Sequence, residues 1–301
     1  MELRRYLLII SLAIAAALII VVWLYPSSND FSADNPSWNG AAEFTDSFIT
    51  SSLRSYADLT ENPDNSILIV IPYSDFTDSD LALLSSYIND GGTLVLADDY
   101  GYGNTVLEHL QINASFNGEP LLDPVFNYKN SFFPRITDFA SSALTENLDS
   151  IVLNHATGMT FGTGVEIIAQ SSATSFIDIN GNQLYDQEEP AGPLPVAAQA
   201  NFGDGIVIML SDPSIIINCM QDMDDNLTFI TNIMRVKGTN SQIMLDEFHL
   251  PSANLDEAKS ILTSMRDALA TPAGTAAIVT AIVVLILLPI WLRRKGGNHG
   301  S

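Results

Sequence analysis

Two uncharged apolar segments near the ends of the chain constrain its structure more than any other feature of the sequence. They cover residues 6–25 and 273–292, and neither contains an Asp, Glu, Lys or Arg. Each is as long as the roughly 20 residues that an α-helix needs to cross a membrane. The sequence therefore predicts two transmembrane helices. The first is expected to remain as an uncleaved anchor, because its apolar core is long for a signal peptide and no convincing A-x-A cleavage site follows it.

The charges beside the two segments predict how the chain is oriented in the membrane. Basic residues lie at the outer end of both segments, namely Arg4, Arg5, Arg293, Arg294 and Lys295. Lys and Arg are enriched on the cytoplasmic side of a membrane. We therefore expect residues 1–5 and 293–301 to be cytoplasmic and residues 26–272 to form an extracellular domain. The lipid bilayer is thus the first predicted partner.

The predicted extracellular region is strongly acidic. Five of the 12 basic side chains and one of the 35 acidic side chains lie outside it, so residues 26–272 carry seven basic and 34 acidic side chains, a net charge of −27. Such a region repels phosphate, which argues against binding to nucleic acid. The single cysteine excludes a disulfide scaffold and a multi-cysteine metal site. Two sequons, at Asn113 and Asn226, would be available for glycosylation outside the cell.

The first part of the acidic region contains a βαβ pattern. Residues 66–73 and 93–97 are nearly unbroken apolar runs, which indicate strands that are buried on both faces. Between them, residues 78–89 carry apolar side chains at helical period, and Thr77 and Asp80 have the spacing of a capping box. A strand, a helix and a strand in this order predict parallel strands with a right-handed crossover.

The same pattern extends through the rest of the region. Further strands are predicted at residues 150–154, 165–170, 204–211 and 242–245, and further helices at residues 41–56, 104–111, 225–235 and 255–269. Residues 110–134 show no clear period and receive no assignment. Together these elements predict an α/β fold in three layers with a mostly parallel sheet, flanked by the two transmembrane helices.

One segment has the spacing of a calcium-binding loop. With Asp178 as position 1 of 12, oxygen-bearing side chains fall at positions 3, 5, 9 and 12, and position 7 supplies a backbone carbonyl. The predicted ligands are Asp178, Asn180, Asn182, Leu184, Asp186 and Glu189. Hard oxygen donors without His or Cys favour Ca²⁺ over zinc, and the ion is expected to brace the loop. Against this stand Gln183 at position 6, where the EF-hand has glycine, and the alternative of a solvated Asn-Gly hairpin turn.

Polar residues also follow the predicted parallel strands, where α/β folds place their sites. A candidate ligand cleft contains Asp75, Asp98, Asp99 and Asn104, and candidates for acid–base catalysis are His155, Asp212 and His249. A trio of Ser211, His155 and Asp246 can be drawn as well, but no G-x-S-x-G motif supports it. For the aspartates we favour helix capping and turn formation over catalysis. Cys219 is expected to be a buried thiol rather than a nucleophile.

Several short motifs follow one another in a definite order along this region. They are GGTLVLADDYGYGN at residues 91–104, the loop 178–189 with GPLPV at 192–196, SDPS at 211–214, Asp225-Asn226 and DEFH at 246–249. This order resembles the DUF4350 family of archaeal and bacterial membrane proteins, over most of residues 35–250. That family is similar in fold to class I glutamine amidotransferases, so the resemblance implies a flavodoxin-like sheet. Those enzymes place a cysteine after a strand where this chain has Asp98 to Tyr100, so the resemblance does not imply their chemistry.

The resemblance also implies a partner. Members of the family are often encoded near MoxR-type ATPases, which implies a membrane-associated protein assembly. The sequence as a whole predicts a membrane-anchored, non-catalytic extracellular domain that binds a partner protein or ligand and has a calcium-stabilised loop. The alternative hypothesis is a membrane-bound hydrolase or transferase that uses the strand-end Asp and His residues.

Overall fold

The computed structural model describes residues 2–60, 62–251, 254–277, 279–280, 283 and 287. The chain divides into two units, Pro26–Ser252 and a second that joins Met1–Tyr25 to Ala253–Ser301. In the second unit, helices α1 (Glu2–Leu24) and α6 (Asn254–Ala270) are in contact, and the Arg266 guanidinium carbon lies 5.5 Å from the centre of the Trp23 ring.

The predicted membrane segments meet the described residues only in part. Counting those residues alone, the structure has no helix that combines the length and the apolar content needed to cross a membrane. Most of the predicted second segment, residues 273–292, and the whole predicted tail, residues 293–301, lie outside the described residues.

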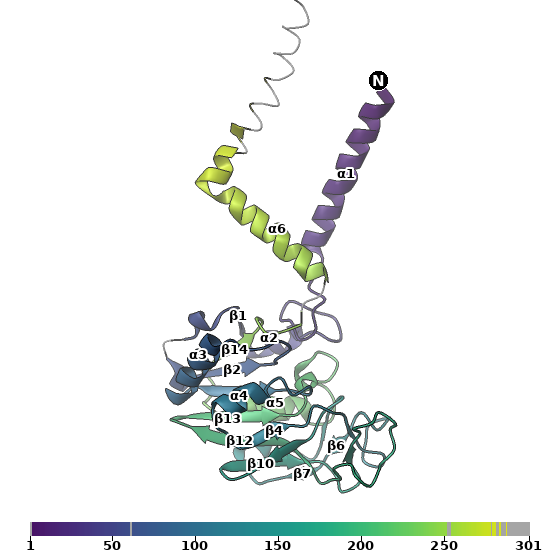
Figure 1. Ribbon diagram of the computed structural model, residues 1–301, viewed down its shortest axis with the longest axis vertical. Coiled ribbons are helices and arrows are strands. Elements are labelled where there is room, and N and C mark those ends of the chain that lie inside the picture. The colour runs from purple at the N-terminus through teal and green to yellow at the C-terminus, as the bar shows by residue number, and fades with distance from the viewer. Residues whose placement is uncertain are drawn as a thin grey trace, which may run out of the picture. The chain divides into compact units, whose positions relative to one another are not determined.

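An eight-stranded sheet runs through the unit Pro26–Ser252 (Figure 1). In spatial order its strands are β1 (Ser51–Leu53), β14 (Gln242–Asp246), β2 (Ser66–Val70), β3 (Thr93–Ala97), β13 (Gly205–Leu210), β12 (Pro195–Phe202), β10 (Val165–Gln170) and β7 (Asp138–Phe139). The first five strands are parallel, and the pairings from β13 to β7 are antiparallel. The large, mostly parallel sheet of an α/β fold is therefore confirmed.

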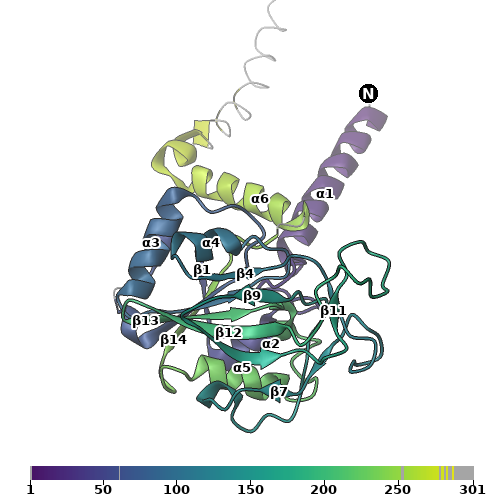
Figure 2. The same cartoon turned by 60° about the horizontal axis from the view of Figure 1, so that its bottom comes forward.

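Helices cover both faces of this sheet. α3 (Asp78–Asn89) and α4 (Asn104–His109) lie on one face, and α2 (Ala42–Phe48) and α5 (Asn226–Met234) lie on the other (Figure 2). Alternate side chains of β2 enter the two cores, because successive residues of a strand point to opposite faces. Ile67 and Ile69 pack with α5, whereas Leu68 and Val70 pack with α3. Burying a residue of this size on either face contributes about 1.5–3 kcal/mol.

The predicted βαβ unit is confirmed closely. α3 has the predicted bounds, and its capping box is formed by Thr77 and Asp80, with each side chain bonded to the backbone of the other residue. β3 also has its predicted bounds. The capping box and the unbroken apolar run were sufficient to predict the bounds of α3 and β3, because both local signals agree with the tertiary packing.

The predicted helix over residues 41–56 is wrong beyond Phe48. Ile49 takes a left-handed conformation with φ 50°, and the chain then enters edge strand β1 and the short 3₁₀-helix η1 (Tyr56–Asp58). Phe44 packs in the core on one face of the sheet and Leu53 in the core on the other. One helical face could not have buried both residues, so the apparent period was misleading.

Two further differences concern the antiparallel half. The predicted strand at 150–154 is β8 (Ile151–Val152), which pairs with β6 (Arg135–Ile136) outside the main sheet. Strand β12 was not predicted, because its alanines have a low strand preference. It joins β13 through Gly203, whose φ is 57° and whose added Cβ would lie 2.7 Å from the Asn89 carbonyl oxygen. Glycine meets both requirements.

The remaining elements are short and surround the antiparallel half. β4 (Ala114–Phe116) pairs with β9 (Met159–Phe161), and β5 (Leu121–Leu122) pairs with β11 (Phe176–Ile177). Three other 3₁₀-helices are η2 (Pro63–Asn65), η3 (Ala143–Thr145) and η4 (Pro213–Ile216). Much of the predicted strand-end site is built on these connections rather than on the sheet itself.

Candidate functional site

The carboxyl ends of the parallel strands bring several predicted site residues, together with Tyr73, to one edge of the sheet. Tyr73 follows β2, Asp98 and Asp99 follow β3, Asp212 follows β13, and Asp246 ends β14. β14, β2, β3 and β13 are consecutive neighbours in the sheet. This is the edge at which α/β folds usually bind ligands.

Asp98 has a structural role at this edge. Its side chain is buried and accepts hydrogen bonds from the backbone N–H groups of Tyr100 and Gly101 at 2.9 Å and of Gly103 at 2.6 Å. Asn104, a second member of the predicted cleft, exchanges two hydrogen bonds with the backbone of Phe116. Both side chains therefore fix the turn after β3, which agrees with the turn-forming role that we favoured for the aspartates.

Asp99 and Asp212 are two carboxyls at this edge whose pKa values burial raises to about 7. Burial, followed by the charges of Asp212 and Asp98, raises the pKa of Asp99 to about 7. Burial likewise raises the pKa of Asp212 to about 7, although its oxygens accept hydrogen bonds from Asn154 N–H at 2.6 Å and Ser214 N–H at 2.7 Å. Both carboxyls therefore change protonation near neutral pH.

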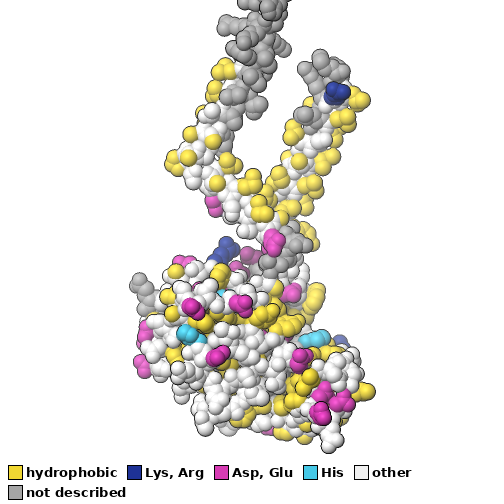
Figure 3. All heavy atoms as spheres, viewed as in Figure 1, with side chains coloured by type: hydrophobic (Ala, Val, Ile, Leu, Met, Phe, Trp, Pro, Cys, Tyr) yellow, Lys and Arg dark blue, Asp and Glu magenta, His cyan; other side chains and the backbone are white. Residues whose placement is uncertain are grey.

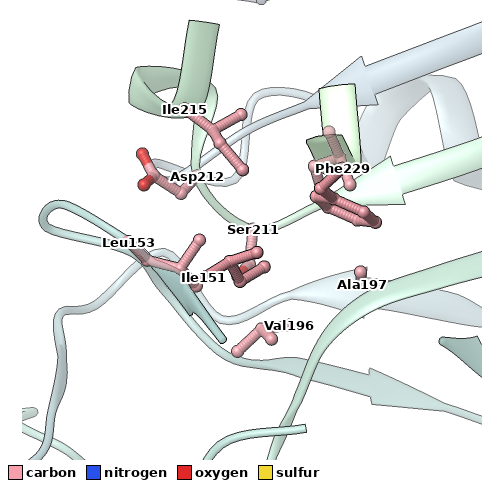
Figure 4. Close-up of a pocket in the computed structure, with 9 residues that line it drawn as sticks. Ile151, Leu153, Val196, Ala197, Ser211, Asp212, Ile215 and Phe229 are labelled. Carbon is pink, nitrogen blue, oxygen red and sulfur yellow. The ribbon is translucent and has the colours of Figure 1, made fainter. Parts of the chain in front are cut away.

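Tyr73 lies close to these two carboxyls. Burial raises the pKa of its phenol, and the charges of Asp99 and Asp212 raise it further. Its ring packs at 5.7 Å from Phe31 and 5.6 Å from Tyr100. The carboxylate of Asp212 points away from the apolar side chains of Val196 and Phe229, which line the same small pocket (Figure 4). The phenol therefore stays protonated, and Asp99 and Asp212 are the groups at this edge whose raised pKa values suit them to proton transfer.

His249 has no access to a substrate in this structure. It is buried, stacks on Phe76 with ring centres 4.2 Å apart, and its Nδ1 lies 2.6 Å from Asp246 Oδ2. The Tyr56 hydroxyl donates to the same Asp246 oxygen at 2.7 Å. Since Asp246 is bonded to Tyr56 and His249, the trio of Ser211, His155 and Asp246 is not assembled. This histidine holds the end of β14 in the core.

His155 lies on the solvent side of the edge. Its backbone is left-handed with φ 55°, its ring stacks on Phe132 at 4.8 Å, and its Nδ1 lies 2.7 Å from Asn154 Oδ1. Burial lowers the pKa of its imidazole. The ring is therefore neutral at pH 7 and suited to packing against a ligand. Asp75 is exposed and has no hydrogen-bond partner among the described residues.

An open groove beside Asp212 was not predicted from the sequence. It has a volume of about 470 Å³, and we call it the aromatic groove. Its lining comprises Trp38, Tyr128, Lys129, Asn130, Phe133, Asn154, His155, Cys219, Met220 and Met223. Four separate segments contribute to it, so no single motif marks it. One signal was available, the aromatic run FNYKNSFF at 126–133, but it falls in the stretch that received no assignment.

Cys219 corrects a prediction, because it is exposed rather than buried. Partial burial nevertheless raises the pKa of its thiol, so the thiolate is scarce at neutral pH. The residue follows η4 and lies in the aromatic groove, and it does not stand in the turn after β3. Its place and its pKa do not favour a nucleophilic role.

The predicted calcium loop folds around its first and last acidic residues. Asp178 is buried, and its two oxygens accept the N–H groups of Asn182 at 3.1 Å and Gln183 at 3.0 Å. Glu189 accepts the N–H groups of Ile179 at 2.9 Å and Asp186 at 3.0 Å. The loop is therefore wound inward, with its first and twelfth positions both directed at its own backbone.

The side chains of the remaining predicted ligands also converge. Asn180 and Asn182 both donate to Asp186 Oδ2, at 2.6 and 2.9 Å. Gln183, at the position where the EF-hand has glycine, takes the left-handed conformation with φ 62°. Among the residues that the structure describes, no group of three or more His, Cys, Asp or Glu side chains is placed to hold a metal ion. Asparagine and backbone oxygens would have to complete any calcium site in this loop.

Comparison with known proteins identifies the family. Among solved structures, the chain is similar to the mmIFT52 N-terminal domain, with 14% identity and a TM-score of 0.45 over 57% of this chain and 77% of that one. It is similar to a putative thua-like protein from Bacteroides uniformis ATCC 8492, with 14% identity and a TM-score of 0.40 over 62% and 74% of the two chains. It is also similar to a β-galactosidase from Bacillus circulans sp. alkalophilus, with 12% identity and a TM-score of 0.34 over 56% of this chain and 22% of that enzyme.

These likenesses are too distant to carry an argument about function. No curated protein matches the chain. A family model described as "Domain of unknown function (DUF4350)" matches residues 33–234, which include every strand of the main sheet except β14. Because this match covers more than half of its length, the chain belongs to the DUF4350 family.

Proposed function

We propose that the protein is a membrane-anchored extracellular α/β domain that binds a ligand or a partner protein and does not transform it. The anchor rests on the uncharged segments 6–25 and 273–292 and on the basic residues that flank them. Apolar side chains are exposed along α1, as Figure 3 shows, and Leu12 and Leu18 are about 60% exposed. Contact with lipid would remove this apolar surface from water.

The single observation that carries the binding function is that the polar residues at the carboxyl edge of the sheet are buried, whereas a groove beside them is open to solvent. His249, Asp246 and Asp98 are buried there and bonded to other protein groups. The part that faces solvent is the aromatic groove, with a volume within the range of about 300–1,000 Å³ that is typical of ligand sites. A surface of this kind favours binding over acid–base chemistry by histidine.

Calcium is part of the same proposal. Asp178, Asn180, Asn182, Asp186 and Glu189, with the Leu184 carbonyl, would supply the six to eight oxygens that Ca²⁺ takes. The left-handed backbone at Gln183 supports the proposal, because the EF-hand loop turns at this position. Binding would exchange some of the hydrogen bonds within the loop for bonds to the ion, and the ion would brace the loop.

Two further elements come from the family resemblance. We propose that the likeness to class I glutamine amidotransferases concerns the three-layer fold alone, since Asp98, Asp99 and Tyr100 stand after β3 and Cys219 lies elsewhere. We also propose that the protein belongs to a membrane-associated assembly with a MoxR-type ATPase. Neither element bears on the groove.

A hydrolase or transferase is the second candidate, and a specific observation favours it. Asp99 and Asp212 have pKa values near 7, and Tyr73 lies close to both. A carboxyl that changes protonation near the working pH is suited to general acid or base catalysis. In this mechanism Asp99, which is the more accessible of the two, would exchange a proton with the substrate. Asp212 would be the second acid–base group of the site.

Site-specific photocrosslinking of the full chain in its native membrane tests the proposed function. A photoreactive amino acid in place of Trp38 should yield a crosslinked product, whereas the same group in place of the exposed Leu83 on α3 should not. In parallel, purified protein is incubated with chromogenic esters, amides and phosphate esters. Turnover that disappears in Asp99→Asn, together with no crosslink from position 38, would replace the binding function with the enzymatic one.

A further inference from the structure

The aromatic groove differs in charge from the domain around it. Residues 26–272 carry 34 acidic side chains, yet none of the described residues that line the groove is Asp or Glu. Lys129, one of only seven basic residues in that region, is exposed on the groove wall. The guanidinium carbon of Arg135 lies 6.0 Å from the centre of the Tyr128 ring. Its Nε is 2.7 Å from Asp224 Oδ2, so the charge of Arg135 is already paired and does not serve an anionic ligand. Among the described residues that line the groove, Lys129 is therefore the one that carries a full charge, and this charge is positive.

The walls of the groove are aromatic and held in place. Trp38 is 69% exposed, but its backbone is fixed, because its carbonyl accepts Cys219 N–H at 3.1 Å and the neighbouring Ser37 carbonyl accepts the Asn218 side-chain amide at 2.6 Å. An exposed indole on a fixed backbone presents a flat apolar face at little cost in conformational entropy. Tyr128 lies under Lys129, with the ammonium nitrogen 4.7 Å from the ring centre.

Polar donors line the same groove as these aromatic rings. The side-chain amides of Asn130 and Asn154 have oxygens that are already bonded, to Phe132 N–H at 2.9 Å and to the His155 ring at 2.7 Å. Within the described part of the chain their amide nitrogens have no hydrogen-bond partner. Flat apolar faces and amide donors in one groove match a sugar ring, which has an apolar C–H face and a rim of hydroxyl oxygens.

Two residues on the groove wall have a strained backbone. Lys129 has φ 72° and His155 has φ 55°, a region that residues other than glycine rarely occupy. Such strain persists where the surrounding structure enforces it, and it concentrates at ligand-binding sites. Both strained residues line the groove, and Lys129 is the one cation among the described residues that line it.

We propose that the aromatic groove binds an anionic carbohydrate, a uronic acid residue either free or within a glycan, with a sugar ring packed on Trp38 and its carboxylate paired with Lys129. The inference rests on the proposed binding function and names its ligand class. The positive charge of Lys129 and the absence of carboxylates among the described lining residues favour a ligand with a carboxylate. The aromatic rings and the amide groups of Asn130 and Asn154 favour a ligand with a sugar ring. An extracellular domain would meet such sugars in cell-surface polymers.

Calorimetric titration of the full chain in detergent tests this proposal, with trigalacturonate as the probe. Its methyl ester is the matched control, since it keeps the sugar rings and replaces each carboxylate with a neutral ester. We expect trigalacturonate to bind and the ester to bind about tenfold or more weakly, as expected when a charge-assisted hydrogen bond is lost. Galacturonate monomer is titrated as well. Monomer binding equal to that of the trimer would assign the site to a free sugar acid, and weaker monomer binding would assign it to a glycan.

Three variants locate the binding. Lys129→Met should weaken trigalacturonate binding about tenfold and should remove the difference between acid and ester. Lys237→Met changes the net charge equally outside the groove and should leave binding unchanged. Trp38→Ala should abolish binding of both ligands. A thermal unfolding scan confirms that each variant is folded.

Failure of the inference is distinguishable from failure of the proposed function. Equal affinity for acid and ester overturns the charge assignment, while the groove remains a binding site. If trigalacturonate does not bind the folded wild-type protein, but position 38 still crosslinks in the native membrane, the ligand class is wrong and the binding function stands. Absence of both signals removes the inference and the function together.

Discussion

Asp99 gives the folded domain a specific dependence on pH. Burial and neighbouring carboxylates raise its pKa to about 7, whereas an unfolded aspartate titrates near pH 4. The folded state thus retains a proton that the unfolded chain releases, so the stability from this group is full below about pH 4 and falls as the pH rises towards 7. Asp99→Asn should therefore raise the melting temperature at pH 8 by a few degrees, on the order of 1 kcal/mol, and change it little at pH 4. Thermal unfolding of the variant and of the exposed control Asp75→Asn checks this result, and an equal gain at both pH values would contradict it.

Asn226 shows how one buried amide can connect distant segments. It is fully buried, accepts Val152 N–H and donates to the carbonyls of Val152 and Met220, each at 2.9 Å. The predicted sequon at this residue is therefore closed to glycosylation in the folded domain, because both amide hydrogens are in use. Asn226→Asp would remove two donors and bury a charge, and we expect a loss of about 3 kcal/mol or more. Denaturant unfolding beside the exposed control Asn201→Asp measures it, and a loss below 1 kcal/mol would refute this account of the amide.

At the scale of secondary-structure elements, the end of α2 contains strain that a substitution can relieve. Ile49 has φ 50° although it is β-branched, and its side chain is 90% exposed. Glycine takes this conformation freely, and little packing is lost with an exposed side chain. Ile49→Gly should therefore stabilise the protein by about 1 kcal/mol. Ile49→Val, which keeps the β-branch, should give no gain. Chemical unfolding measures the free energy of unfolding of both variants. A loss of stability in Ile49→Gly would mean that the Ile49 side chain makes a stabilising contact that outweighs the backbone strain.

The calcium loop offers an element-scale prediction with opposed variants. Gln183 and Gly181 have φ values of 62° and 74°, and no atom lies within 4 Å of a Cβ added at Gly181. Gln183→Gly should stabilise the folded loop by about 1 kcal/mol, because glycine takes this conformation without strain. Gly181→Ala should destabilise it for the opposite reason. Thermal unfolding of both variants measures these effects, and titration of the full chain with calcium tests whether the loop binds the ion. No heat with the wild type or with Gln183→Gly would remove the calcium proposal.

The elements also show which parts of the fold can be predicted from a sequence. α3 and β3 were predicted with correct bounds, because capping, period and burial all agree in residues 77–97. α2 and β12 were not, because Leu53 crosses to the second core and the alanines of β12 are placed by their neighbours. These outcomes depend on tertiary packing, which local propensity does not contain.

The candidate site was predictable to a smaller degree. The convergence of Asp99 and Asp212 follows from the rule that parallel strands end at one edge, so their common position could be expected from the sequence, whereas their role in a site stays a prediction. The burial of His249 could not be anticipated, because it depends on Phe76 and Tyr56 from other elements. The aromatic groove was missed for the same reason, since Trp38 and Tyr128 meet only after the chain has folded.

At the scale of the whole molecule, one side chain can report the topology. Cys219 is the only cysteine and is exposed within the unit Pro26–Ser252, so a thiol reagent labels the chain at one known place. If residues 26–272 lie outside the cell, a membrane-impermeant maleimide added to intact cells should label the protein, and Cys219→Ser should abolish the label. The reaction is run near neutral pH with a long incubation, because burial raises the pKa of the thiol and slows labelling, whereas in alkaline buffer maleimides also react with lysine amines. Inverted vesicles provide the matched preparation. Labelling in inverted vesicles but not in intact cells would place the domain in the cytoplasm. In that case the groove could not bind carbohydrate outside the cell, even if it binds trigalacturonate in detergent.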